Sequence, residues 1–327
     1  MIISKTPLRM SFVGGGSDLP SFYERSEGAV ITSTIDKYIY VTVNKKFDGD
    51  IRLSYSKTET VRRPEKIKHP IVREVLKKLT IPGGIEITSV ADIPSKGTGL
   101  GSSSAFTVGL LNALQAYNRQ FSSPRSLAEQ ACEIEMDILK EPIGRQDQHS
   151  VAFGGFNKIL FHEDHRVSVH PVVCLQNTKH DFEKNILMLY TGIGRKASDV
   201  LSEQNANLAK NKKIFTLMKK MVALAHDFHT ELQKNSLGSV GEILHTGWMY
   251  KKEMAMGITS SAIDRWYDIG RKNGALGGKV LGAGGGGFLM FYAPTDRHEK
   301  ICRALPKLRP VPVCFEPEGS KIIFIHE

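Results

Sequence analysis

The chain contains 327 residues, 41% hydrophobic and 24% charged, which are ordinary values for a globular protein. Its formal net charge is +10 at pH 7, and the basic residues are dispersed rather than gathered into an aromatic-studded tract. This pattern argues against a nucleic-acid-binding module and leaves a polyanionic small substrate or a generally basic surface as explanations. We therefore expect a small-molecule substrate and no nucleic-acid partner.

The sequence shows no sign of targeting, membrane insertion or oxidative folding. The N-terminal stretch MIISKTPLRMSF lacks the basic-then-apolar layout of a signal peptide, and no apolar run approaches the roughly 18 residues of a membrane span. The four cysteines show no CxxC spacing, which argues against a zinc site or a disulfide framework. We expect a soluble, cytoplasmic protein without a membrane partner.

The length is about twice that of a typical domain, which predicts two domains, over residues 1–180 and 181–327. In the first half, alternating patterns predict strands over residues 2–13, 38–47 and 83–94. Helical periodicity is expected over residues 70–79, 102–117 and 123–140. Ser126 and Glu129 form the S-x-x-E pattern of a capping box, which predicts the start of the last of these helices.

Further along the chain, strands are expected after Gly154-Gly155 and over residues 185–192. Residues 197–235 form a long helical pattern rich in lysine, and we interpret the lysines as a solvated face. The stretch GKVLGAGGGGFLMFYA, residues 278–293, predicts a strand, a tight turn and a second strand.

The stretch SKGTGLGSSSAF, residues 95–106, places three glycines followed by three consecutive serines between a predicted strand and a predicted helix. Glycines let the backbone approach an anion, and the N–H groups of the first helical turn then point at it. The spacing matches neither the Walker A pattern nor the dinucleotide-binding G-x-G-x-x-G. A simply capped helix is the alternative, but a cap requires only one serine. The stretch therefore predicts a phosphate-binding loop.

A formal G-x-G-x-x-G occurs later, at Gly282, Gly284 and Gly287. It is followed by the strand-like FLMFYA, so no helix N-terminus is available to receive a pyrophosphate. We interpret these glycines as a tight turn whose backbone fits against another loop or a ligand.

Glu135 falls in the apolar stripe of the predicted 123–140 helix, whereas Glu129, Glu133 and Asp137 fall on its opposite face. A carboxylate buried there costs several kcal/mol unless a cation or a metal accompanies it. A structural ion pair and a Mg²⁺ ligand are the two explanations. A neighbouring phosphate loop favours Mg²⁺, which proteins hold with few side chains plus phosphate oxygens.

Three further charged residues lie in segments that contain glycine: Arg9 and Asp18 in PLRMSFVGGGSD, and Asp147 in the predicted loop GRQDQHS. Alone, each is compatible with a turn. Phosphoryl transfer, however, requires a phosphate cradle, Mg²⁺, a positive charge on the transferred group and a carboxylate at the acceptor hydroxyl. The sequence contains a candidate for every one of these parts.

Three motifs in this order resemble those of the GHMP kinase superfamily: TPLRMSFVGGGSD, PSKGTGLGSSSA and LGAGGGGF. The resemblance covers nearly the whole chain. It implies an α+β protein of two domains, the first like domain 2 of ribosomal protein S5 and the second ferredoxin-like. It also implies an ATP-dependent phosphotransferase that uses Mg²⁺.

The resemblance assigns a role to each matching position. ATP would be bound by Lys96, Gly97, Gly99, Leu100, Gly101, Ser102, Ser103 and Ser104. Ser103 and Glu135 would ligate Mg²⁺, Asp147 would act on the acceptor hydroxyl as base or orienting group, and Arg9 would neutralise charge. Gly15, Gly16 and Asp18 would contact the sugar. Gly284, Gly285 and Gly286 would form the glycine turn beside the nucleotide.

Within the superfamily, SKTPLRMSFVGGGSDLPSFY and GRQDQHSVAFGGFN most resemble the D-glycero-D-manno-heptose 7-phosphate kinases, which phosphorylate the anomeric hydroxyl. The alternatives are an L-fucose or other hexose 1-kinase, and a sensor that binds ATP and sugar without turnover. A galactokinase would carry GEHTD where this chain has GGGSD. A phosphorylated sugar needs a second basic pocket, for which Arg195 and Lys196 are candidates; two solvated surface cations are the alternative.

Overall fold

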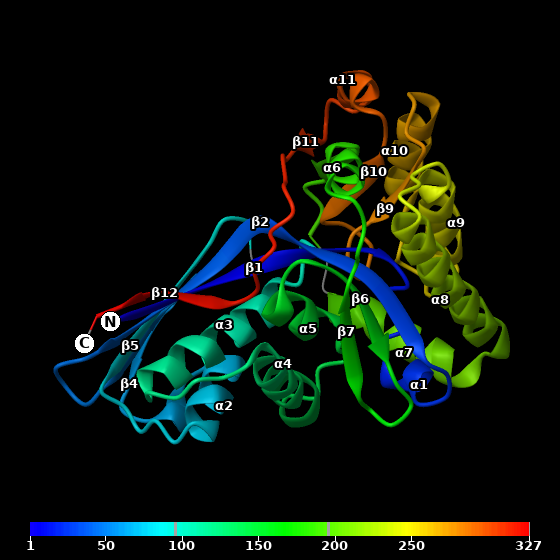
Figure 1. Cartoon of the computed structure of the whole chain (residues 1–327). Helices are drawn as coiled ribbons and strands as arrows, with labels where there is room; N and C mark the ends of the chain where they lie inside the picture. Colours follow the sequence, from blue (N-terminus) through cyan, green and yellow to red (C-terminus); the bar gives the residue numbers. More distant parts are fainter. Residues whose placement is uncertain (95–96, 195–196, 327) are drawn as a thin grey trace.

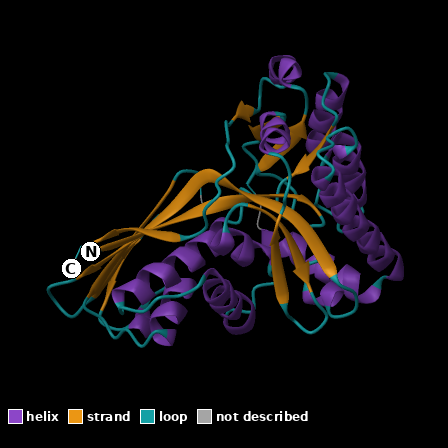
Figure 2. Cartoon of the chain, in the orientation of Figure 1, coloured by secondary structure: helices purple, strands orange, loops and turns teal. Residues whose placement is uncertain are grey.

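The computed structural model describes residues 1–94, 97–194 and 197–326, and within them the chain forms two β-sheets flanked by helices (Figures 1 and 2). The first sheet has the strand order β12-β1-β2-β5-β3-β4, with β6 and β7 continuing from β2. Its strands are β1 (Ile2–Val13), β2 (Gly28–Lys45), β3 (Ile51–Ser54), β4 (Thr58–Val61), β5 (Ile85–Ala91), β6 (Phe156–Phe161), β7 (Val167–Pro171) and β12 (Lys321–Ile325).

The long strand β2 organises this sheet. It runs antiparallel to β1 from Val43 opposite Ile2 to Ile31 opposite Val13. One half of β2 also pairs with β5 and the other half with β6, so the strand is shared by two groups of partners. We predicted only its second half, because the buried first half lacks the alternation of apolar and polar residues that marks a half-exposed strand.

Helices cover one face of the first sheet, below β1 and β2 in Figure 1. The helical segments before residue 155 are α1 (Pro20–Tyr23), the 3₁₀ turn η1 (Pro64–Lys66), α2 (Pro70–Lys78), α3 (Ser102–Tyr117), α4 (Pro124–Cys132), the π-helical η2 (Glu133–Ile138) and α5 (Gln146–Phe153). Helix α3 is buried along most of its length, which fixes the glycine–serine loop that precedes it, the predicted phosphate loop.

The predicted capping box at the start of α4 is wrong. The cap is Ser123, whose hydroxyl accepts a hydrogen bond from the Ser126 N–H at 3.2 Å. Pro124 then occupies the first helical position, where its missing N–H costs nothing. Ser126 therefore lies inside the helix, and its hydroxyl instead accepts a bond from Gln130 at 2.9 Å.

The second sheet has the order β11-β8-β10-β9, and its strands are β8 (Ile186–Tyr190), β9 (Gly277–Val280), β10 (Phe288–Tyr292) and β11 (Arg309–Pro310). The accompanying helices are α6 (Gln176–Lys184), α7 (Ala197–Lys210), α8 (Lys212–Gln233), α9 (Val240–Lys252), α10 (Ser261–Lys272) and α11 (Thr295–Ala304). The predicted strand, turn and strand over 278–293 are confirmed as the antiparallel pair β9 and β10. These mixed sheets and helices confirm the α+β class.

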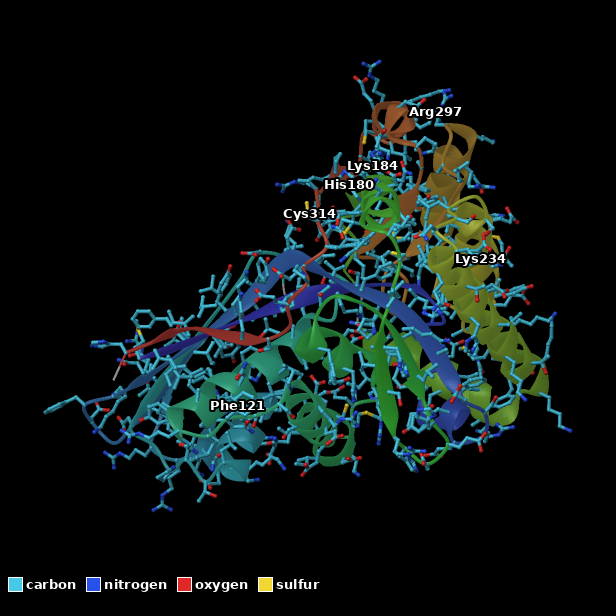
Figure 3. All side chains as sticks on the ribbon, in the orientation of Figure 1. Phe121, His180, Lys184, Lys234, Arg297 and Cys314 are labelled. Carbon is cyan, nitrogen blue, oxygen red and sulfur yellow. The ribbon has the colours of Figure 1, made fainter. Side chains whose placement is uncertain are left out.

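The helical region predicted over 197–235 is two helices rather than one. Asn211 adopts an extended backbone conformation, and its side chain accepts hydrogen bonds from the N–H groups of Lys213 and Ile214, which begins α8. Exposed cations of the second lobe project from separate helices (Figure 3). Lys184 lies 2.7 Å from Asp181 and Lys234 lies 3.8 Å from Glu231, so each of these two cations has a carboxylate partner three residues before it.

The first sheet with its helices and the second sheet with α6 to α11 are called here the first and second lobes. The two lobes share one hydrophobic core. Phe12 of β1 lies 5.1 Å from Phe182 of α6 and 6.1 Å from Phe228 of α8, measured between ring centroids. The C-terminal strand β12 returns to the first sheet and pairs antiparallel with β1, so both chain ends lie side by side (Figure 1). The domain boundary near residue 180 stays a prediction. Across the described ranges, no helix has the length and apolar character needed to cross a membrane.

Candidate functional site

The glycine–serine stretch forms a loop that ends at the N-terminus of α3. Gly97, Gly99 and Gly101 have φ angles of +70°, +73° and +74°, in the left-handed region that favours glycine. Ala105 makes the first intrahelical bond, to the Gly101 carbonyl at 2.9 Å. The backbone N–H groups of Ser102, Ser103 and Ser104 come before this residue and have no acceptor within the helix. They point out of the helix end, where the helix dipole favours an anion.

The remaining phosphate-loop residues anchor it. Leu100 is fully buried, and its carbonyl accepts the Arg9 backbone N–H at 3.0 Å. The Ser102 hydroxyl lies 3.2 Å from the Thr98 hydroxyl. These contacts hold the backbone of the loop in place, while Ser103 is exposed. Lys96, the predicted cationic member of the loop, lies outside the described residues.

The second glycine motif packs directly on the phosphate loop. A Cβ atom added to Gly99 would lie 2.2 Å from the Leu281 carbonyl oxygen, and one added to Gly287 would lie 2.4 Å from the Thr98 carbonyl oxygen. No side chain fits at either point. Gly284 and Gly286 instead pack against the backbone of Ile258 and Ile193, and the Gly285 N–H donates to the Ile258 carbonyl at 2.8 Å.

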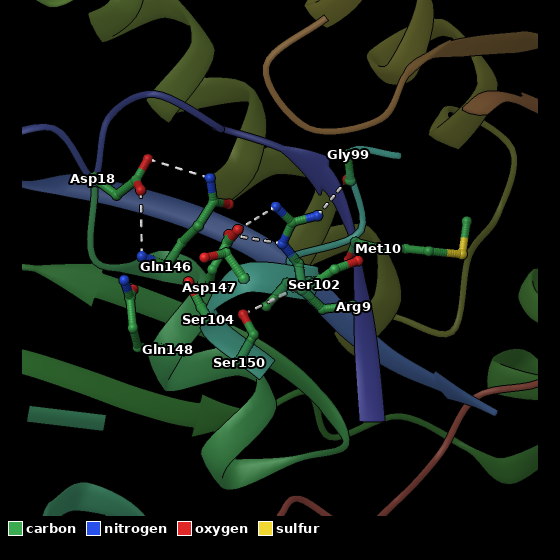
Figure 4. Close-up of polar contacts among 12 residues, drawn as sticks. Arg9, Met10, Asp18, Gly99, Ser102, Ser104, Gln146, Asp147, Gln148 and Ser150 are labelled. Atoms are coloured by element: carbon green, nitrogen blue, oxygen red, sulfur yellow. Dashed lines mark hydrogen bonds and ion pairs between the residues drawn. The ribbon is translucent and has the colours of Figure 1, made fainter. Parts of the chain in front are cut away.

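Arg9 and Asp147, 138 positions apart in the chain, form a two-pronged ion pair beside the phosphate loop (Figure 4). Arg9 Nε donates to Asp147 Oδ1 at 2.8 Å and Nη2 donates to Oδ2 at 2.7 Å. Arg9 Nη1 donates to the Gly99 carbonyl at 2.7 Å. Asp147 was predicted in a loop but lies in the first turn of α5, where the helix N-terminus favours a carboxylate.

Glu135 is 1% exposed, as its position in the apolar stripe predicted, although its segment is π-helical rather than α-helical. Ser104 and Thr107 each donate to it at 2.8 Å, Gln148 donates at 2.6 Å, and the Ser103 hydroxyl lies 3.3 Å away. No cation pairs with Glu135 in the described residues. Burial raises the pKa of its carboxyl, and the hydrogen bonds oppose that rise.

The pair formed by Ser103 Oγ and Glu135 Oε1 has the chemistry of a magnesium site. Both ligand atoms are hard oxygens, and they lie beside the loop where phosphate oxygens would complete the coordination. In the part of the chain that the structure describes, no group of three His, Cys, Asp or Glu side chains could hold a metal by itself. A metal ion here would therefore depend on bound phosphates, which is the usual arrangement for Mg²⁺.

Asp18 lies at the far side of Gln146 from the phosphate loop (Figure 4). Its carboxylate accepts the Gly16 N–H at 2.9 Å and the Gln146 backbone N–H at 3.2 Å. Burial, followed by the charge of Asp147, raises the pKa of this carboxyl. Gly16 belongs to the turn of Gly14, Gly15 and Gly16. A Cβ atom added to Gly16 would lie 2.0 Å from Gln204 of α7, so the close approach of α7 requires glycine at this position.

Lys251 is a site residue that the sequence reading missed. It lies on α9, and its Nζ donates to the Gly15 carbonyl at 3.2 Å and to Gln204 Oε1 at 2.8 Å. Burial lowers its pKa to about 8, and the charge of Asp18 opposes that change. Lys252 follows it directly on the same helix, so no local signal distinguishes Lys251 from a solvated cation.

Lys279, on β9, was missed as well, although its sequence carries a signal. It is a charged residue in the short strand GGKV, whose four residues are all buried. This is the pattern that identified Glu135. Burial lowers its pKa to about 7, and the positive charges of Lys251 and Arg9 add to that effect.

Three buried polar atoms near Gly15 and Gly16 have no hydrogen-bond partner among the described residues. They are Ser11 Oγ, Gln146 Oε1 and Gln204 Nε2. Buried polar atoms without partners are uncommon in proteins and costly. Together with Lys251 and Asp18, they leave hydrogen-bonding capacity for a polar ligand. Arg195 and Lys196, the predicted second-phosphate residues, lie outside the described ranges.

A helix N-terminus beside an arginine–carboxylate pair provides parts that phosphoryl transfer requires. Comparison with known families matches residues 65–155 to the GHMP kinases N terminal domain and residues 228–310 to the GHMP kinases C terminal domain. Together these matches span more than half of the chain. The chain belongs to the GHMP kinases, and as such it is an ATP-dependent phosphotransferase with an alcohol acceptor.

Individual proteins agree with this assignment. The chain is 29% identical to the D-glycero-alpha-D-manno-heptose 7-phosphate kinase of Campylobacter jejuni, over 94% of this chain and 93% of that protein. It is 24% identical to the bifunctional fucokinase/GDP-fucose pyrophosphorylase of Arabidopsis thaliana, over 91% of this chain and 30% of that protein. The crystal structure of a D-glycero-D-manno-heptose 1-phosphate kinase from Bacteroides thetaiotaomicron matches with a TM-score of 0.83, 25% identity and 100% coverage of both chains.

Proposed function

We propose that this kinase transfers the γ-phosphoryl group of ATP to the anomeric hydroxyl of a sugar, with D-glycero-D-manno-heptose 7-phosphate as the acceptor. The observation that carries the proposal is the Arg9–Asp147 pair, which lies 2.7 Å from the Gly99 carbonyl of the phosphate loop through Arg9 Nη1. With ATP bound at this loop, the pair would provide a carboxylate and a cation beside the terminal phosphate. The similarity to a heptose 7-phosphate kinase over nearly the whole chain supports the choice of acceptor.

The phosphate loop would bind ATP through its backbone N–H groups and the α3 N-terminus. Ser103 and Glu135 would hold Mg²⁺, which would neutralise charge on the phosphate oxygens. Ser104, Thr107 and Gln148 hold the Glu135 carboxylate through its buried oxygens, so its position does not depend on the bound nucleotide.

Asp147 would orient the acceptor hydroxyl and receive its proton. In the transfer, the bond between the γ-phosphorus and the bridging oxygen of ATP breaks, a bond to the sugar oxygen forms, and ADP leaves. Arg9 holds both oxygens of Asp147 and carries the positive charge nearest to this carboxylate. The Asp147 side chain is 23% exposed, which keeps it accessible to a substrate.

Asp18, Gln146 and Lys251 would line the sugar pocket, since they carry polar groups around the glycine turn at Gly15. A carboxylate, an amide and an ammonium group can together recognise several hydroxyls. Arg195 and Lys196 stay our candidates for the phosphate at the far end of the sugar.

The test is turnover of Mg·ATP with a panel of acceptors. The panel contains D-glycero-D-manno-heptose 7-phosphate, the isomeric heptose 1-phosphate, L-fucose, mannose, galactose and mevalonate. We expect selective turnover of the 7-phosphate to a 1,7-bisphosphate. Turnover of the heptose 1-phosphate alone would show that the kinase phosphorylates a hydroxyl other than the anomeric one. Turnover of L-fucose alone would show that L-fucose, not the heptose phosphate, is the acceptor. ATP binding without any turnover would favour the sensor.

Asp147→Asn provides the matched variant for the same assay. It preserves shape but cannot accept the proton, so we expect kcat to fall by about 100-fold or more, because general-base contributions are of that size. Asp296→Asn, at an exposed position on α11, should leave kcat unchanged. Equal rates for Asp147→Asn and the unmodified enzyme would exclude Asp147 from the reaction.

A further inference from the structure

Lys279 is a buried cation that has no counterion among the residues that the structure describes. The residue is 6% exposed, and no hydrogen bond or ion pair joins its ammonium group to any residue of the described ranges. Removing an unpaired charge from water is costly, so such groups are normally paired or neutralised. A bound anion would therefore stabilise the charged form of Lys279.

The neighbours of Lys279 further disfavour its charged form. The two charged groups that act on it, Lys251 and Arg9, are both cations, and their repulsion adds to the burial that lowers its pKa. Arg9 is already paired with Asp147. Lys251 already donates to the Gly15 carbonyl and to Gln204. Lys279 is thus the member of this cationic cluster that has no protein partner in the described structure.

The position of Lys279 connects it to the phosphate loop. Two residues beyond it, the Leu281 carbonyl packs on Gly99, whose own carbonyl accepts the Arg9 guanidinium. Side chains two residues apart lie on the same face of a strand. Gly277 abuts the backbone of α9, where an added Cβ atom would lie 2.1 Å from the Gly241 carbonyl oxygen. Lys279 therefore lies on the α9 face of β9, which is the side of Lys251.

We propose that Lys279 binds the γ-phosphoryl group of ATP, as a second cation that acts together with Arg9 during transfer. This inference rests on the proposed phosphotransfer at the same site. An ammonium group suits a phosphate as a compact point charge. The segment that follows Lys279 packs on the phosphate loop through Leu281, whereas Lys251 contacts the glycine turn at Gly15. We therefore pair Lys279 with the terminal phosphate of ATP rather than with the sugar.

The test compares a nucleoside diphosphate with a non-hydrolysable triphosphate analogue. Binding of ADP and of the β,γ-imido analogue of ATP, each with Mg²⁺ and without sugar, is measured calorimetrically for the unmodified chain, Lys279→Met and Lys279→Arg. We expect Lys279→Met to weaken the triphosphate about 10-fold and ADP less than 2-fold, as loss of one charged contact predicts. Lys279→Arg should retain part of the preference for the triphosphate over ADP, because it keeps the positive charge.

Two controls accompany the measurement. Lys300→Met, at an exposed position on α11, should change neither affinity. The melting temperature without nucleotide should not fall in Lys279→Met, because the variant removes an unpaired buried charge and keeps a long apolar side chain. If it does fall, Lys279→Gln repeats the comparison with a neutral polar side chain.

Equal losses of both nucleotides, or no loss of either, would overturn the proposal. A change confined to the KM of a phosphorylated acceptor would also overturn it and would move Lys279 to the sugar site. Failure of the proposed function gives a different result: no sugar is phosphorylated by the unmodified chain, while Lys279→Met still loses triphosphate affinity selectively.

Discussion

At the residue scale, this protein buries several charged and titratable side chains, and three of them, Glu135, Asp18 and His149, have specific hydrogen-bond partners. Glu135 is enclosed by hydroxyl and amide donors, whereas Asp18 receives backbone N–H groups. His149 is held in the same way: its Nδ1 lies 2.8 Å from the Arg145 carbonyl, an acceptor, so Nδ1 carries the proton. Burial is the largest influence on the pKa of each of these groups.

His149 makes stability depend on pH. Burial lowers its pKa from 6.5 to about 4. Between these values the unfolded chain binds a proton that the folded chain does not, so the stability contributed by this residue is lost as pH falls from about 6.5 to about 4. The full loss is about 3 kcal/mol. We expect His149→Gln to show a smaller decrease in the free energy of unfolding over this range, measured by urea denaturation.

His165→Gln is the matched control, because the side chain of His165 is 55% exposed. It should keep the pH dependence of the unmodified chain. Identical pH profiles for His149→Gln and the unmodified chain would contradict this assignment.

At the element scale, the site depends on two backbone turns that fit against each other. The phosphate loop before α3 and the glycine turn between β9 and β10 touch through Gly99 and Leu281 with no room for a side chain. A left-handed conformation and a close approach both require glycine at position 99. This contact joins the first lobe to the second at the point where phosphates would bind.

Gly99→Ala and Gly192→Ala separate these two requirements. Both glycines have similar φ angles, +73° and +71°, but an added Cβ atom at Gly192 meets nothing within 4 Å. Gly192→Ala should cost about 1 kcal/mol of unfolding free energy, from backbone strain alone. Gly99→Ala should cost roughly 3 kcal/mol and should weaken ATP binding at least tenfold, by chemical denaturation and calorimetry respectively. Equal effects of the two variants would show that the lobe contact contributes nothing.

At the scale of the whole molecule, the two lobes are joined by a continuous core and by the returning C-terminal strand. Phe182 is fully buried, and its ring lies 5.1 Å from Phe12, 5.5 Å from Phe228 and 5.9 Å from Phe315. These four rings come from β1, α6, α8 and the segment that leads to β12. A core of this kind predicts that both lobes unfold together.

We expect Phe182→Ala to lower the free energy of unfolding by about 3–5 kcal/mol, because it leaves a large cavity, while unfolding stays a single transition in scanning calorimetry. Phe121→Ala is the control: that side chain is 92% exposed, in the loop between α3 and α4 (Figure 3), and its loss should change little. Two transitions, only one of which moves in Phe182→Ala, would show that the lobes unfold independently.

The sequence by itself determined the local elements and the family motifs. Strand β1 and helix α3 were predicted with the limits that the structure has, since their signals come from neighbouring residues in the chain. Glu135 was identified as buried for the same reason. The errors also have local causes. Ser126 matched a capping pattern that competed with Ser123, and the 197–235 pattern contained a second cap at Asn211.

Only the tertiary structure decided which of these residues meet. Arg9 reaches Asp147 across 138 positions, and Lys251 and Lys279 join them from a helix and a strand of the second lobe. The pairing of β12 with β1 connects the two chain ends. Such contacts depend on sheet order and on packing between elements distant in the chain. Local periodicity carries no information about them, because it reports only which face of each element is buried.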